Sequence, residues 1–130
     1  MNTMEEKYRS VGLDYDLIAD KYKDLQEYEE IVNAYLSDPF FKELGDYIDV
    51  EDYELAKDAT KGLFILAQEL FLYPLYLALM EIYEDLEDEI YTDVRCHYDE
   101  MIKVYEKIRG IFCVWCNSSW SRSRRMWSGI

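Results

Sequence analysis

Apolar side chains recur at spacings of three and four along most of this chain, with polar residues between them. This spacing is typical of helices that bury one face and expose the other. The pattern predicts an all-α protein whose helices cover about residues 15–23, 25–36, 40–48, 51–72, 74–86 and 92–112.

Acidic residues and prolines mark where several of these helices begin. Asp14, Asp38 and Asp49 are candidate N-caps, because a carboxylate accepts hydrogen bonds from the first free N–H groups of a helix. Pro39 and Pro74 each fit a first helical turn, where a missing N–H group costs little. Short connections between such helices predict an antiparallel four-helix bundle with additional short N-terminal helices.

The same spacings predict which side chains face inward. We expect Leu17, Ile18 and Ile31 to be buried in the two N-terminal helices. Many of the 13 tyrosines lie seven residues apart, and we expect them at the bundle edge, with the ring inside and the hydroxyl outside. The expected inner face of the longest helix consists of Leu55, Ala56, Ala59, Leu63, Leu66, Ala67 and Leu70.

Charge narrows the range of partners. The 130 residues carry 28 acidic and 14 basic side chains, a net charge of −14. A body so negative repels nucleic acid and anionic membranes and steers basic partners towards itself. We therefore expect neither nucleic acid nor a membrane as a partner.

The last residues differ in composition from the rest. No acidic residue follows Glu106, whereas Arg122, Arg124 and Arg125 lie in the last nine residues. We expect one helical domain over 1–112 and a basic tail over 113–130, rich in Trp, Ser and Arg and poorly ordered.

The location is predicted from what the chain lacks. The first residues are charged with no apolar segment behind them, and the longest apolar run, Leu70–Met80, is too short to cross a bilayer. Three cysteines without a signal peptide suit a reducing compartment. A cytoplasmic location is therefore expected.

Several short motifs along the chain can be aligned, without gaps, with the motifs of one known domain family. They are Asp38-Pro39-Phe40-Phe41, Leu44, Asp52-Tyr53, Ala56 and Leu72-Tyr73-Pro74-Leu75-Tyr76. In this register the chain from Asp38 to about Tyr83 resembles the histidine phosphotransfer (Hpt) domain family. Looser similarity extends from about Val11 to Ile108. The resemblance implies an Hpt-like bundle and, as a partner, a receiver domain or a histidine kinase of a two-component phosphorelay.

The chain departs from this family at the active centre. The gapless register places Lys61 where the family has its phosphate-accepting histidine, Phe64 at the family's lysine and Ile65 at its glycine. A second register aligns Asp58 with the histidine and keeps Lys61-Gly62 as a Lys-Gly pair, but it needs a three-residue insertion further along. We favour the gapless register, and neither register supplies a histidine.

The missing histidine changes the expected chemistry. Phosphotransfer from an aspartate needs an uncharged nitrogen, which imidazole supplies because its pKa is about 6.5. An exposed lysine, with a pKa of about 10.4, stays protonated. We therefore expect no catalytic residue and no enzyme, but a pseudo-Hpt signalling module that docks on its partner without accepting phosphate. Three- and four-residue spacing groups the expected docking face: Lys57, Lys61, Phe64, Ile65 and Gln68.

Two other functions stay open. His97, the single histidine, could make the chain an active phosphotransfer protein if it were exposed on a flat surface. Alternatively, the acidic body could bind and titrate a basic partner. With Cys96 and His97, the CxxC motif Cys113–Cys116 could supply four metal ligands by type, but no second CxxC motif exists. We therefore expect no metal and no cofactor.

Overall fold

The computed structural model describes residues 3–112, and within them the chain is all-helical. The seven helices of this part are α1 (Thr3–Ser10), α2 (Tyr15–Lys21), α3 (Leu25–Leu36), α4 (Phe40–Asp49), α5 (Tyr53–Glu69), α6 (Tyr73–Glu87) and α7 (Val94–Phe112). The expected all-α class is thereby confirmed. The tail over 113–130, with its CxxC motif, lies outside the described residues.

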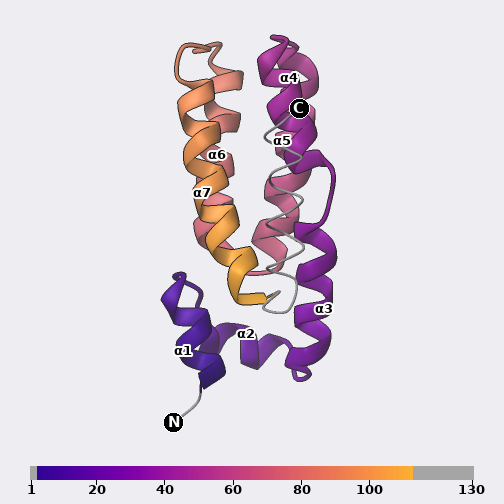
Figure 1. The fold of residues 1–130 in the computed structure, drawn as a ribbon, viewed down its shortest axis with the longest axis vertical. Helices are drawn as coiled ribbons and strands as arrows, with labels where there is room; N and C mark the ends of the chain where they lie inside the picture. The colour runs from indigo at the N-terminus through magenta and orange to yellow at the C-terminus, as the bar shows by residue number, and fades with distance from the viewer. Residues whose placement is uncertain (1–2, 113–130) are drawn as a thin grey trace.

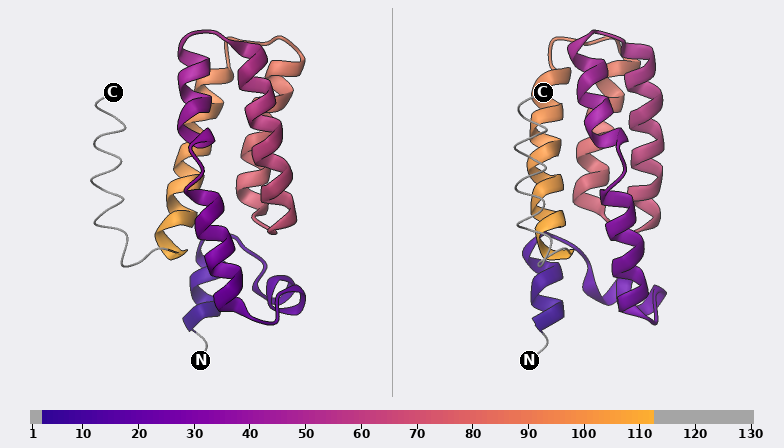
Figure 2. Two further views of the ribbon diagram at one scale, coloured as in Figure 1. Left: turned by 90° about the vertical axis from the view of Figure 1, so that its right-hand side faces the viewer. Right: turned by 45° about the vertical axis from the view of Figure 1, so that its right-hand side comes forward.

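The helices are arranged along one long axis. Figure 1 and Figure 2 show α5, α6 and α7 side by side, with α3 and α4 following one another along the same direction. The closest partners are helices adjacent in sequence, α4 with α5, α5 with α6 and α6 with α7, while α3 packs against α7. The short helices α1 and α2 lie at the end of the molecule where α3 begins.

Helix starts follow the expected chemistry in part. Asp14 and Asp24 accept backbone N–H groups at the starts of α2 and α3. The expectation that Asp49 caps the longest helix was wrong. Asp49 ends α4, and Asp52 caps α5 by accepting the Leu55 N–H at 3.3 Å. This helix is shorter than the predicted range 51–72, because left-handed turns flank it on both sides.

Each of the three connections between α4 and α7 passes through a residue with positive φ. These residues are Glu51 at 59°, Phe71 at 60° and Glu89 at 57°. In each case the next N–H group bonds a carbonyl five residues back, as from Leu72 to Ala67 at 2.9 Å. This is the Schellman arrangement, which ends a helix and satisfies its last carbonyls. This arrangement usually has glycine at the positive-φ position, so Glu51, Phe71 and Glu89 did not indicate it in advance.

Four buried tyrosines correct the expectation that hydroxyls point outward. Their rings pack in the core, and each hydroxyl donates a hydrogen bond to a backbone carbonyl of another helix or helix end. The pairs are Tyr28 with Leu70, Tyr35 with Leu63, Tyr98 with Phe41 and Tyr105 with Leu36. Burial raises the pKa of all four phenols, so they stay neutral donors.

Four apolar residues expected inside are exposed instead. Leu17, Ile31, Leu55 and Leu66 are each between 38% and 46% exposed. Their spacing fits an inner face, but each lies at the margin of its helix's apolar stripe, where no neighbouring helix covers it. The core is otherwise continuous and includes Leu63, Leu75, Leu79 and Met101. None of the described helices is both long and apolar enough to cross a membrane.

Candidate functional site

Helix α5 carries the positions that the family resemblance singles out. Its inner face is built from small and apolar side chains, including Ala56, Ala59, Leu63 and Ala67, which let α4 and α6 pack closely. Thr60 is also buried, and its hydroxyl donates to the Ala56 carbonyl at 2.6 Å, so this polar group is satisfied within the helix. The opposite side of α5 is left open to solvent.

Lys61 lies on this open side. Asp58, Lys61 and Gly62 are all exposed, so both registers of the Hpt resemblance place their critical residue at the surface. No described carboxylate forms an ion pair with Lys61 within 4 Å. A Cβ atom added to Gly62 would meet no atom within 4 Å, so internal packing does not demand glycine there.

Apolar side chains continue this surface towards the end of the helix. Ile65 is 41% exposed and Leu66 is 43% exposed, and Gln68 is also at the surface. We call the exposed set of Asp58, Lys61, Gly62, Ile65, Leu66 and Gln68 the outer face of α5. Sequence reasoning missed Leu66, because its spacing assigned it to the core.

Two of the predicted docking residues turn towards α6 instead. Phe64 is half-buried, and its ring meets the rings of Tyr83 and Tyr76 edge-on at centroid distances of 5.1 and 6.0 Å. The Lys57 ammonium lies 3.0 Å from the Glu87 carboxylate, and this hydrogen bond raises the pKa of Lys57. The structure thus brings Lys61, Ile65 and Gln68 together at the surface, while Lys57 and Phe64 join α5 to α6.

His97 stands on α7 in a strongly acidic environment. Its Nδ1 atom is hydrogen-bonded to the Asp85 carboxylate, and its Nε2 atom lies 3.6 Å from a Glu81 oxygen. The hydrogen bond with Asp85 raises the pKa of His97, helped by the charges of Asp85, Glu81 and Asp93 and opposed by partial burial. An imidazole whose two nitrogens face carboxylates, and whose protonated form is favoured by them, is a poor nucleophile.

Metal chemistry finds no support in this part of the chain. Within residues 3–112, no three His, Cys, Asp or Glu side chains converge as metal ligands would. Cys96 is exposed as a free thiol, and the other two cysteines lie outside that range.

Comparison of the chain with family models, with curated proteins and with solved structures gave no significant match. The family resemblance therefore stays a prediction made from the sequence motifs.

Proposed function

We propose that this protein is a pseudo-Hpt module, which binds a receiver domain or a histidine kinase of a phosphorelay through the outer face of α5 and accepts no phosphate. In this proposal α5, α6 and α7 form three members of an antiparallel four-helix bundle. The consecutive helices α3 and α4 together supply the fourth member, and α1 and α2 are the additional N-terminal helices.

The observation that carries this proposal is the identity and exposure of residue 61. A lysine occupies the exposed middle of the long helix where the related family would present an imidazole. Unlike an imidazole, the ammonium group of a lysine can bind a phosphorylated or acidic surface but does not attack a phosphoryl group.

The surface around Lys61 suits docking better than catalysis. Gly62 leaves open space beside it, and Ile65 and Leu66 add exposed apolar area. Removing such side chains from water contributes about 25 cal/mol per Å² of apolar area, and this contribution offsets part of the cost of immobilising the two partners. This apolar part favours docking over the alternative of a purely acidic protein that titrates a basic partner, whose binding would depend chiefly on charge.

The alternative of phosphotransfer through His97 is less favoured. That function needs an exposed histidine on a flat surface, whereas His97 is half-buried and engaged by Asp85 and Glu81. The approaching phosphoryl group is negative, so three nearby carboxylates, including Asp93, would repel it.

The test is a phosphotransfer assay with a panel of phosphorylated receiver domains, with binding to the same receivers measured in parallel. The proposal expects binding without acid-labile label on this protein. Ile65→Asp should abolish the binding, while Leu77→Asp, which changes an equally apolar and 60% exposed residue on α6, should leave it intact. Label that disappears in a His97→Ala variant would refute the proposal, as would the absence of binding to any receiver or kinase.

A further inference from the structure

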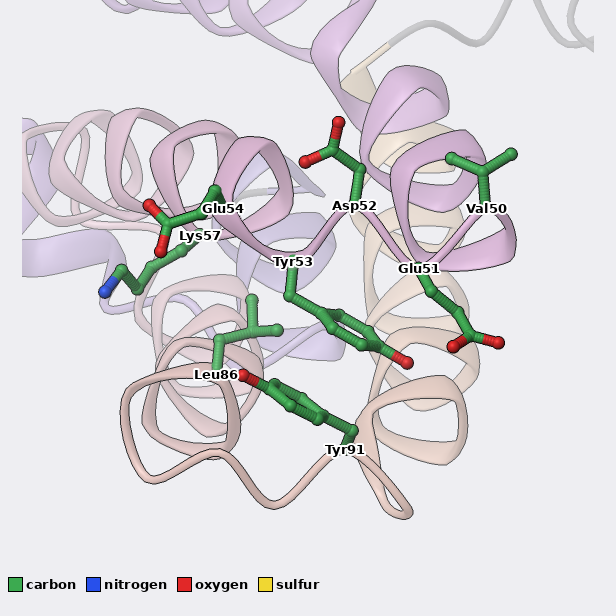
Figure 3. A pocket seen from close by; sticks show the side chains of 8 residues that line it. All are labelled: Val50, Glu51, Asp52, Tyr53, Glu54, Lys57, Leu86 and Tyr91. Carbon is green, nitrogen blue, oxygen red and sulfur yellow. The ribbon is translucent and has the colours of Figure 1, made fainter.

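A cavity of about 500 Å³ opens where the α4–α5 connection meets the α6–α7 connection. Its aromatic wall is formed by Tyr53 and Tyr91, whose rings stack almost parallel, with centroids 3.9 Å apart and planes 5° apart. Figure 3 shows the two rings one above the other, their hydroxyls pointing in opposite directions. The buried side chain of Leu86 also lines the cavity.

Three carboxylate side chains also belong to the lining of the cavity. Glu51, Asp52 and Glu54 line the same cavity, and Glu51 and Glu54 are exposed. Neither of these two glutamates forms an ion pair with any residue between 3 and 112. The cation in the lining, Lys57, is already held by Glu87 at 3.0 Å. The lining carries three carboxylates and one ammonium group, so the cavity combines an aromatic surface with an excess of negative charge.

We propose that this cavity binds an arginine side chain presented by a basic segment of a partner protein. A guanidinium group is planar, stacks on aromatic faces and pairs with carboxylates placed around its edge. The volume falls within the range of ordinary ligand sites, about 300–1,000 Å³. No three carboxylates in the described part of the chain converge as the ligands of a compact metal ion do. This arrangement favours a cation with delocalised charge, such as guanidinium, over a divalent metal ion.

The choice of arginine follows from the geometry of the rings. A caged ammonium ion needs aromatic faces on several sides, whereas Tyr53 and Tyr91 cover one another and leave only outer faces. A flat guanidinium can lie on such a face while its N–H groups reach Glu51 or Glu54. This inference does not depend on the outer face of α5 or on the family resemblance.

The test titrates the full chain with three blocked peptides at about 0.15 M salt, where long-range attraction is screened. The peptides are identical except for one arginine, lysine or citrulline, the last being a neutral analogue of arginine. Amide shifts in the NMR spectrum locate the site. We expect the arginine peptide to shift Tyr53, Glu54 and Tyr91, the lysine peptide to bind more weakly and the citrulline peptide not to bind.

Matched variants separate this site from the general negative charge of the protein. The double variant Glu51→Gln and Glu54→Gln should weaken arginine binding by about tenfold or more. Glu27→Gln with Glu30→Gln removes the same charge from exposed positions on α3 and should change it less than about twofold. Tyr91→Leu, which keeps apolar packing, should weaken binding several-fold. Equal losses in both double variants, or equal binding of citrulline, would overturn the proposal.

Discussion

His97 on α7 and Asp85 on α6 form a hydrogen-bonded pair that joins these two helices across their interface. The Asp85 side chain is only 12% exposed, so the carboxylate meets the imidazole in a largely dry environment. A charged pair in such a place stabilises the interface most when both partners are ionised.

This pair predicts how stability depends on pH. The pKa of His97 is raised in the folded protein, first by the hydrogen bond with Asp85. The stabilisation should be fully present below the unfolded pKa, about 6.5, and lost as the pH rises through the higher folded value. Urea unfolding of the protein and of His97→Gln between pH 5.5 and 9 checks this. A difference in unfolding free energy that stays constant with pH would contradict it.

The Tyr28 hydroxyl should be important for stability. It donates at 2.6 Å to the Leu70 carbonyl at the end of α5, and Pro74, four residues on, has no N–H group to do so. Tyr28→Phe leaves this acceptor buried without its partner, which should cost about 1–3 kcal/mol of unfolding free energy. Tyr73→Phe, at a surface tyrosine, is the control and should change stability by less than about 0.5 kcal/mol. Equal effects would show that the Leu70 contact contributes little.

Replacing each of two helical glycines by alanine should change the stability of the fold in opposite directions. A Cβ atom at Gly45 would lie 2.6 Å from the Tyr98 hydroxyl, which is itself bonded to the Phe41 carbonyl at 2.9 Å. Gly45→Ala should therefore destabilise the fold by about 1–3 kcal/mol. Gly62 faces open space, so Gly62→Ala should stabilise α5 by about 0.5–1 kcal/mol. Thermal unfolding of both variants measures the difference, and shifts in the same direction would contradict it.

The proposed relation to phosphotransfer proteins predicts a gain of function. Lys61→His places an imidazole on the exposed middle of α5, with a large neutral fraction near pH 7. We expect this variant to acquire acid-labile label from a phosphorylated receiver that the protein binds. Asp58→His tests the other register, and label there instead would make that register correct. Failure of both variants to take up label would count against the resemblance.

The sequence predicted the positions of the helices better than the contacts between them. The range 25–36 agrees with α3, because capping and periodicity are local properties. Helix α1 was not expected, since Thr3–Ser10 is largely polar and offers only Met4 and Tyr8 as apolar neighbours. The tyrosine contacts were missed for a different reason: their acceptors are backbone carbonyls on remote segments, which no pattern of side chains reveals.

At the candidate site, too, the sequence predicted some positions correctly and others wrongly. Periodicity placed Lys61, Ile65 and Gln68 on one side of a helix, and all three are exposed. It also placed Phe64 there, although this ring packs against Tyr83. Whether a residue at the margin of a helical face is buried depends on where the neighbouring helix packs. Phe64 is therefore half-buried and Leu66 is exposed.

The short Schellman connections bear on how the chain folds. Because α4, α5, α6 and α7 each pack chiefly on the helix next to them in sequence, the closest native pairings close short loops, while the contacts of α3 and α4 with α7 join distant segments. Chains dominated by local contacts cross a low entropic barrier and refold in microseconds to milliseconds. Stopped-flow refolding that takes seconds would contradict this expectation. The turns at Glu51, Phe71 and Glu89 thus keep paired helices adjacent in sequence, which favours fast folding as well as fixing where each helix ends.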